Sequence, residues 1–358
     1  MSRQQTLIVL CLRSCIFVIR SVEKKDIDDL FALSQTVFFI NLPADRAIIE
    51  QRIESSIKSF TKPSKNLAKN YYLFVLEDLE TNKVLGISMI HAQHGTEEEP
   101  HFYLRVGQEH KFSSSINTGF ILGTLELGWD SDGPTEIGGI VLDRSFRGHA
   151  DRLGRQLSLA RFLFMGIHPT KFKKMIHSEL MPPLDKNGKS PLWEAVGRKF
   201  LNMDYYEADT LSRTNKEFIL SLFPSENIYI NLLPLEARDA IGKVGPETLG
   251  VKKLLKSIGF KYIHEVDPFD GGPHYRCALN DVKPVKTMGS GQLKLSSSTF
   301  DPTGATEALV SLPAEDGKFL AIKSLIHIDG NSITLPSEIT EKLKLENLAK
   351  IQFITLDY

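Results

Sequence analysis

Cysteine is scarce in this sequence. Of the 358 residues only Cys11, Cys15 and Cys277 are cysteines, and none of them forms a CxxC pair. This scarcity excludes a disulfide framework and a cysteine-based zinc motif, and it favours a reducing compartment such as the cytoplasm. Cys277 can be interpreted as a nucleophile or as a small residue beside a strand, and the second interpretation is preferred. The sequence predicts no metal site.

An excess of charge of one sign is also missing. The chain has 43 lysines and arginines against 44 aspartates and glutamates, a net charge of −1. A nucleic-acid-binding protein usually carries a basic excess, so nucleic acid is not expected as a partner. Hydrophobic residues make up 42% and charged residues 24%, proportions typical of a globular protein with a large core.

Long apolar runs are absent as well. The run over residues 7–18 is interrupted by Arg13 and is too short to cross a bilayer, so no membrane association is expected. A signal peptide fits less well, because no clear small-residue cleavage site follows. Residues 1–16 are interpreted as an N-terminal extension ahead of a first strand at 17–22.

The most informative stretch that is present covers residues 136–165. A strand-like apolar run ends at Leu142 and is followed by a polar turn rich in arginine and glycine. An amphipathic helix then begins near Leu153. Free N–H groups and the positive end of a helix can hold a pyrophosphate, and arginines in the turn add donors suited to phosphate. Those arginines are Arg147, Arg152 and Arg155. The stretch is therefore interpreted as a nucleotide or coenzyme cradle.

The rest of the chain alternates helices and strands. A β-hairpin is expected from 71–77 and 83–92, with further strands at 102–106, 136–142, 174–179, 261–266 and 274–279. Helices are expected at 44–60, 190 onward, 215–222, 235–241 and 246–258. Serine, threonine and glycine dominate residues 287–304, which suggests a linker or mobile loop over 285–304. A small β-rich module is expected at 305–358, after a main α/β domain at 17–284.

A strand with a carboxylate, an Arg-Gly turn and a following helix resemble the GNAT acyl-CoA N-acyltransferases, whose usual turn is RxxGxG/A. Here Arg147 and Gly148 open the turn, and Leu153 and Gly154 close it, with about two extra residues between them. Over most of its length the chain resembles the arginine N-succinyltransferase family. The resembling blocks are 71–78, 103–107, 136–143, 161–165, 190–193, 203–204, 208–209 and 269–273.

This resemblance implies a fold and a reaction. The fold is α/β (α+β), a mixed, mostly antiparallel GNAT-like sheet flanked by helices, with a large helical insertion in the main domain. The reaction transfers succinyl from succinyl-CoA to the α-amino group of L-arginine, with direct attack in a ternary complex. Succinyl-CoA is a co-substrate and no tightly bound cofactor is needed. The partners implied are small molecules, and a homo- or hetero-oligomer is left open.

The resemblance also implies roles for residues. Glu136 begins the strand before the cradle, where GNAT enzymes commonly place a general base, although a surface carboxylate is the alternative. Coenzyme contacts are implied for Leu142, Arg147, Gly148, Arg152, Leu153, Gly154 and Arg155. Gly138 and Gly139 are interpreted as a close approach of the pantetheine arm, with a β-bulge as the alternative.

The acceptor arginine requires acidic residues at one end and a basic residue at the other. Candidates for the guanidinium are Glu179, Asp204, Asp209 and Asp270, and Arg105 is the candidate for a carboxylate. Each of these residues can equally be a structural ion pair or cap. His101, His264 and His274 could shuttle protons, but hydrogen-bonded structural histidines are the preferred interpretation.

Two alternatives remain. The chain can be an N-succinyltransferase subunit acting on ornithine or another amino acid in a hetero-oligomer. It can also be a non-catalytic GNAT-fold protein with a binding or regulatory role. Turnover with different amines separates these possibilities.

Overall fold

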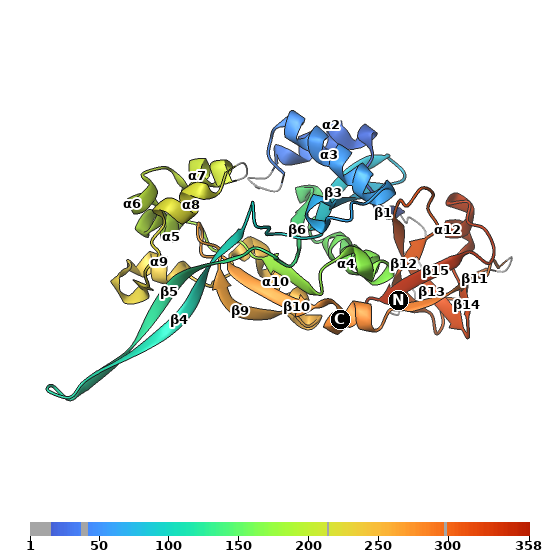
Figure 1. The fold of residues 1–358 in the computed structure, drawn as a ribbon. Helices are drawn as coiled ribbons and strands as arrows, with labels where there is room; N and C mark the ends of the chain where they lie inside the picture. Colours follow the sequence, from blue (N-terminus) through green and yellow to red (C-terminus); the bar gives the residue numbers. More distant parts are fainter. Residues whose placement is uncertain (1–15, 37–41, 213–214, 297–298) are drawn as a thin grey trace.

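A computed structural model describes residues 16–36, 42–212, 215–296 and 299–358. In these ranges fifteen strands form one continuous sheet in the order β12-β15-β11-β14-β13-β1-β2-β3-β6-β7-β10-β9-β4-β5-β8 (Figure 1). The strands are β1 (Phe17–Ser21), β2 (Tyr71–Asp78), β3 (Lys83–His91), β4 (His101–Ser113), β5 (Thr118–Asp130), β6 (Thr135–Leu142), β7 (Met175–Glu179), β8 (Ile228–Tyr229), β9 (Lys261–Val266), β10 (Pro273–Ala278), β11 (Gly289–Leu293), β12 (Thr306–Leu312), β13 (Leu320–Asp329), β14 (Ser332–Thr334) and β15 (Lys350–Thr355).

Helices cover both faces of this sheet. They are α2 (Ile27–Ser34), α3 (Arg46–Thr61), α4 (Leu153–Ile167), α5 (Pro191–Ala195), α6 (Gly197–Leu201), α7 (Tyr205–Ser212), α8 (Glu217–Leu222), α9 (Leu235–Ala240), α10 (Leu249–Ser257), α11 (Lys283–Lys286) and α12 (Ser337–Lys342). None of the described helices is both long and apolar enough to cross a membrane. Residues 1–15 of the expected N-terminal extension lie outside the described ranges.

The centre of the sheet is buried on both faces. Its strand β2 carries apolar side chains on both faces, and each face is covered by helices. Tyr72 and Phe74 point into the core around α4, whereas Leu73 and Val75 point into the core beneath α2 and α3. Successive side chains of a strand face opposite sides, so a fully apolar strand needs a cover on each side. The predicted hairpin of β2 and β3 is confirmed.

The predicted cradle helix is α4, and its apolar face is buried. Leu153, Leu157, Ala160 and Phe164 are each at most 1% exposed. Their spacing places them on one stripe of the helix. The prediction of an amphipathic helix after the basic turn is confirmed, and the helix lies against the same strands that lead into the turn.

The strand expected at 102–106 is much longer than predicted. β4 and β5 pair without a break from His101–Asp130 to Ser113–Thr118, and the far end of this hairpin projects from the molecule (Figure 1). Its base packs with α5 to α8 around Trp193, which is fully buried. The apolar pattern that predicted the strand ends at Val106, because the projecting part of β4 is largely exposed and has no buried apolar face.

The linker expected over 285–304 is wrong in part. Residues Lys283–Lys286 form α11, and Gly289–Leu293 form strand β11. A Cβ on Gly289 would lie 2.2 Å from the ring of Phe353, and a Cβ on Gly291 would lie 2.7 Å from a backbone oxygen. Close packing therefore explains the glycines that suggested a loop.

The C-terminal β-rich module is a small closed barrel. Its strands follow the order β12-β15-β11-β14-β13, and pairing of β12 with β13 closes the ring. β1 pairs with both β13 and β2, so the barrel is joined to the main sheet. The expected mixed, mostly antiparallel sheet with a small barrel is confirmed.

Candidate active site

Two neighbouring parallel strands part at the centre of the sheet. Pairing of β6 with β7 is recorded at Thr135–Ile176 and Glu136–His177, and at no later position of the described strands. Beyond Glu136 the facing backbone edges of the two described strands do not pair with each other. An unpaired strand edge offers N–H and C=O groups to a ligand, so this opening is the natural place for an extended substrate.

The glycines of β6 form a β-bulge on its other edge. The register against β3 passes from Met89–Gly138 to Ile87–Val141, which leaves one extra residue on β6. Gly139 has a φ of +58°, a conformation that favours glycine. The bulge, which was the alternative interpretation of Gly138 and Gly139, is therefore the local cause of the glycine pair.

A buried arginine supports this bulge from α4. Arg161 is 1% exposed, and its Nη1 donates to the carbonyl oxygen of Gly138 at 3.2 Å. Its other donors bind the carbonyl and hydroxyl oxygens of Ser158. Burial lowers the pKa of Arg161 to about 9. The guanidinium therefore links α4, the predicted cradle helix, to the strand that carries Glu136.

The predicted cradle lies at the other end of β6. A Cβ on Gly154 would meet only the Leu142 side chain, at 3.8 Å, so the helix start lies beside the strand end. Leu153 and Gly154 are the first two residues of α4, and their amides belong to the four that lack an intrahelical acceptor. Gly148 has a φ of +76° and open space around it. Backbone donors therefore face an accessible loop.

The arginines of the turn have protein partners in part. Arg147 forms an ion pair with Glu247 at 3.0 Å. Arg155 donates to the carbonyl oxygens of Leu356 and Tyr358 near the C-terminus, which turns its side chain toward the barrel. Arg152 is exposed at the N-cap of α4, with a φ of +53°. Of the three, Arg152 is the arginine best placed to meet a phosphate.

Glu136 lies where β6 and β7 begin to part. Its carboxylate Oε2 is 3.0 Å from Nδ1 of His94, and its side chain is 12% exposed. Burial alone would raise the pKa of Glu136, but the charge and hydrogen bond of His94 lower it to about 2. The carboxylate is therefore ionised at neutral pH.

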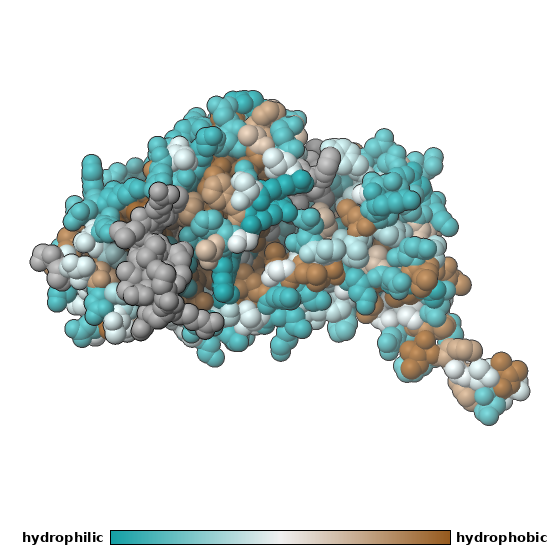
Figure 2. Space-filling model, turned by 180° about the vertical axis from the view of Figure 1, so that it is seen from behind, coloured by the Kyte–Doolittle hydropathy of each residue, from teal (hydrophilic) through white to brown (hydrophobic). Residues whose placement is uncertain are grey.

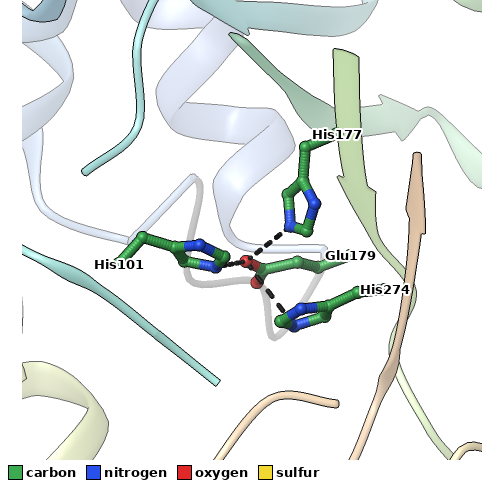
Figure 3. A group of neighbouring side chains, drawn as sticks. All are labelled: His101, His177, Glu179 and His274. Carbon is green, nitrogen blue, oxygen red and sulfur yellow. Dashed lines mark hydrogen bonds and ion pairs between the residues drawn. The ribbon is translucent and has the colours of Figure 1, made fainter. Parts of the chain in front are cut away.

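Three imidazoles converge on a second carboxylate, that of Glu179 (Figure 3). His101 comes from β4, His177 and Glu179 from β7, and His274 from β10. The Nε2 atoms of His101 and His177 lie 2.9 and 3.2 Å from Glu179 Oε1. Nε2 of His274 lies 3.9 Å from the same oxygen. His101 and His274 were noted from the sequence, whereas His177 was missed.

A signal for His177 was present in the sequence. His177 and Glu179 are two residues apart in a strand, so their side chains share a face. That this face also meets His274 follows only once β7 is placed between β6 and β10 in the sheet. His264, the third histidine considered from the sequence, is exposed on β9 with a φ of +59° and does not belong to this group.

Half-buried carboxylates line the turn between β9 and β10. Asp267 Oδ1 accepts hydrogen bonds from the amides of Phe269 and Asp270, and Asp270 Oδ1 accepts one from Gly272. Burial, with the nearby charge of Glu179, raises the pKa of Asp267 to about 7. Burial and the charge of Asp267 raise the pKa of Asp270 well above its usual range. The charges that contribute to raising both pKa values are those of other carboxylates, Glu179 and Asp209 among them.

Asp209 on α7 contributes to the same acidic region. It is 8% exposed, and its charge is among the causes that raise the pKa values of Asp267 and Asp270. Burial and the three aspartates also raise the pKa of Tyr205. Of these groups, Asp209 and Asp270 were predicted from the sequence and Asp267 was not.

Two predicted acceptor residues lie at the surface. Arg105 is 56% exposed and reaches toward Glu126 at 3.7 Å. Asp204 forms a surface ion pair with Arg198. A lysine that was not predicted is better placed. Lys216 donates to the carbonyl oxygen of Pro100 at 3.1 Å, and burial lowers its pKa although Glu179 and Glu136 act in the opposite direction.

Comparison with known proteins decides the family. The sequence model of the arginine N-succinyltransferase beta subunit family matches residues 17–284. Curated arginine N-succinyltransferases from Shigella dysenteriae and Escherichia coli are 36% identical over 272 residues, covering 75% of this chain and 78% of each relative. The chain belongs to the arginine N-succinyltransferase family. It is therefore an acyltransferase, and the family expected from the sequence is confirmed.

A solved structure supports the same assignment. The arginine/ornithine succinyltransferase subunit AI from Pseudomonas aeruginosa matches with a TM-score of 0.81 and 25% identity. The match covers 96% of this chain and 99% of that one, barrel included. The expected GNAT-type fold is confirmed.

Proposed function

We propose that this chain transfers the succinyl group of succinyl-CoA to the α-amino group of L-arginine, giving N2-succinylarginine and CoA. The observation that carries the proposal is the parting of β6 and β7 at Glu136, with the N-terminus of α4 at the other end of β6. Family membership supplies the class of reaction. The two ends of β6 supply a place for each end of the coenzyme.

The coenzyme is proposed to lie along the free edge of β6. From Leu142 to Glu136 the strand spans about 20 Å, at roughly 3.3 Å per residue. Pyrophosphate would bind the amides of Leu153 and Gly154 and the side chain of Arg152, because a helix N-terminus favours an anion. The thioester would then reach Glu136. No tightly bound cofactor takes part in this scheme.

Glu136 is proposed to receive the proton of the attacking amine. A free α-ammonium has a pKa of roughly 8 and is no nucleophile until it loses a proton. Glu136 accepts this proton directly or through a water, with His94 beside it to relay it onward. The nitrogen then bonds to the thioester carbon and the C–S bond breaks. The departing thiolate takes up the second proton, which the nitrogen loses as the amide forms. Backbone N–H groups on β6 stabilise the oxyanion.

The acidic region at the β9–β10 turn is proposed to bind the guanidinium of the acceptor. Asp267 and Asp270 are half-buried carboxylates that a cation would neutralise, and Asp209 lies in the same region. Lys216 is proposed to bind the carboxylate of the acceptor. From the sequence, Arg105 was the candidate for this carboxylate or for that of the succinyl group. Glu179 is surrounded by three imidazoles, so it is not assigned to the guanidinium.

Ornithine is the second candidate acceptor, because buried carboxylates can neutralise an ammonium as well as a guanidinium. The solved relative carries both arginine and ornithine in its name. CoA release from succinyl-CoA and acetyl-CoA, each with arginine, ornithine, lysine or no acceptor, separates the two. Release confined to succinyl-CoA with arginine supports the main proposal. Faster CoA release with ornithine would make ornithine the acceptor in place of arginine. No CoA release with any amine would contradict the proposed acyl transfer.

The projecting hairpin is proposed to contact a second copy of the chain. Its tip carries four exposed apolar side chains, seen as the brown end of the arm in Figure 2. They are Phe112 (69% exposed), Ile116 (69%), Phe120 (63%) and Ile121 (60%). Large apolar side chains gathered on a projecting tip indicate an interaction site.

We place the enzyme in the cytoplasm, consistent with its few cysteines.

A further inference from the structure

We propose that His101, His177, Glu179 and His274 form a binding site for one transition-metal ion of the zinc class. This inference does not depend on the acceptor or on the acyl group transferred. It rests on the convergence of four donor atoms in a buried place, on an imidazole without hydrogen bonds and on carboxylates behind two of the imidazoles.

The donor set has the chemistry and the spacing of a zinc site. The ligand atoms, one from each residue, all lie within 4.8 Å of one another. Zinc binds imidazole nitrogen and carboxylate oxygen at about 2.0–2.2 Å, so tetrahedral ligand atoms lie about 3.4 Å apart. The three Nε2 distances to Glu179 Oε1 of 2.9, 3.2 and 3.9 Å bracket that value. Small side-chain shifts would complete the coordination.

His274 lacks the partners that a buried imidazole requires. It is fully buried, and neither ring nitrogen makes a hydrogen bond within the described structure. Buried polar groups are rarely left unsatisfied. Its Nε2 faces Glu179 across a gap too long for a hydrogen bond (Figure 3). A metal ion at the centre of the group would give Nε2 a partner.

Two of the imidazoles have carboxylates behind them. Nδ1 of His101 lies 3.8 Å from Asp130 Oδ2, and Nδ1 of His274 lies 3.9 Å from Glu265 Oε2. Metal-bound histidines usually direct the second ring nitrogen to a carboxylate or carbonyl, which fixes the ring and its tautomer. In these two histidines a carboxylate lies on that side of the ring, at a distance longer than a hydrogen bond.

His177 requires one rearrangement. Its Nδ1 accepts from Arg276 Nε at 3.1 Å, which leaves the proton on Nε2, the atom that faces Glu179. Metal binding at Nε2 displaces this proton, so Arg276 must release Nδ1. Arg276 keeps its ion pairs with Asp130 at 2.8 Å and Glu265 at 3.1 Å. The same two carboxylates are those behind the other imidazoles.

The ion would connect β4 to the adjacent strands β7 and β10, neither of which is a neighbour of β4 in the sheet. β9 lies between β10 and β4, but its pairing with β4 is recorded only at Leu104–Val266 and Arg105–Glu265. His101 precedes that pair on β4, and its ring lies against the rings of His177 and His274. Four protein ligands from three strands make a closed site, and closed sites stabilise the fold.

The test uses the full chain stripped with a chelator and kept free of CoA, whose thiol would bind metal. We expect one equivalent of Zn²⁺ or Co²⁺ per chain, a visible Co²⁺ spectrum typical of four-coordination, and a Tm rise of about 3 °C or more with saturating Zn²⁺. His274→Gln and Glu179→Gln should each weaken binding at least tenfold. His168→Gln, at the end of α4 outside the group, should bind like the parent chain.

Several results would overturn the site. One is the lack of saturable one-equivalent binding by a chain whose circular dichroism indicates a native fold. Another is unchanged affinity in both His274→Gln and Glu179→Gln. If His274→Gln fails to fold, Glu179→Gln still tests the site, because that change removes only a charge and keeps the shape of the side chain. Loss of acyl transfer with intact metal binding would count against the proposed reaction and leave this site standing.

Discussion

Glu136 is the residue on which the proposed chemistry depends most. Replacing it with glutamine keeps the shape of the side chain and its hydrogen-bonding reach, but removes the proton acceptor. We expect Glu136→Gln to lower kcat by about 10² to 10⁴, the usual contribution of a positioned base. The dissociation constant of succinyl-CoA, measured by calorimetry, should stay within about twofold. Unchanged turnover in this variant would remove Glu136 from the role.

Asp270 tests the acceptor site, and Asp204 is its matched control. Asp270→Asn keeps an oxygen that can accept from the Gly272 amide but removes the group that can carry a negative charge beside the bound guanidinium. Loss of one charge-assisted hydrogen bond costs about 1.5–3 kcal/mol, so kcat/KM for arginine should fall by roughly 10- to 100-fold. Asp204→Asn, in the surface ion pair with Arg198, should change it less than twofold. Equal effects of the two changes would contradict the assignment.

Sequence reasoning found single groups of this site but not their assembly. Glu136 could be found because an Arg-Gly turn and a helix follow its strand. Asp267 and Lys216 carried no such signal, because their proximity to Glu179 depends on contacts between segments far apart in sequence. His101, His177 and His274 lie on three strands, so their convergence depends on strand order. Arg147 and Arg155 were assigned to phosphate, but Glu247 and the C-terminal carbonyls occupy them in part.

The N-terminus of α4 is the element that tests the coenzyme cradle. Gly154 is its second residue and has open space around its Cα apart from Leu142. Gly154→Val should raise the dissociation constant of succinyl-CoA at least tenfold, because its methyl groups would cover the amides proposed to bind pyrophosphate. Stability should change little, since valine is a better helix residue than glycine.

Gly250 provides the control for this element. It is also the second residue of a helix, α10, and a Cβ there meets nothing within 4 Å. Gly250→Val should leave coenzyme binding unchanged when both variants are measured by calorimetry. A similar loss of affinity in both variants, or in neither, would count against phosphate binding at α4.

Elements with buried apolar faces were predictable, and elements without them were not. The hairpin of β2 and β3 and the helix α4 followed from periodic apolar residues. The distal half of the β4–β5 hairpin has few such residues, so its length was missed. In β11 the glycines that make room for Phe353 resembled a linker. Glycine marks either a loop or a close contact, and the sequence alone does not distinguish them.

For the molecule as a whole, the hairpin tip predicts self-association. Phe112 and Ile121 lie on the same face of the hairpin. Phe112 pairs with Gly119 in the β4–β5 register, and Ile121 lies two residues after Gly119 in the same strand, so its side chain points to the same side. The double change Phe112→Ser with Ile121→Ser should weaken a dimer at least tenfold in sedimentation analysis without lowering the Tm by more than about 2 °C. Both residues are exposed, so the monomer core is unaffected.

An exposed apolar residue elsewhere gives the comparison. Phe200 on α6 is 51% exposed, and Phe200→Ser should leave association unchanged. If the parent chain sediments as a monomer at all concentrations, the tip does not bind a second copy, and a different subunit becomes the partner to seek.

The central claim concerns the whole enzyme and both of its substrates. The most direct measurement is mass and NMR analysis of the product formed by the full chain from succinyl-CoA and L-arginine, with acetyl-CoA and acceptor-free reactions in parallel. We predict arginine succinylated on its α-nitrogen, one CoA released per product, and no stable acyl-enzyme without acceptor. A succinylated enzyme that accumulates without arginine, or no succinylarginine despite bound coenzyme, would contradict direct transfer by this chain.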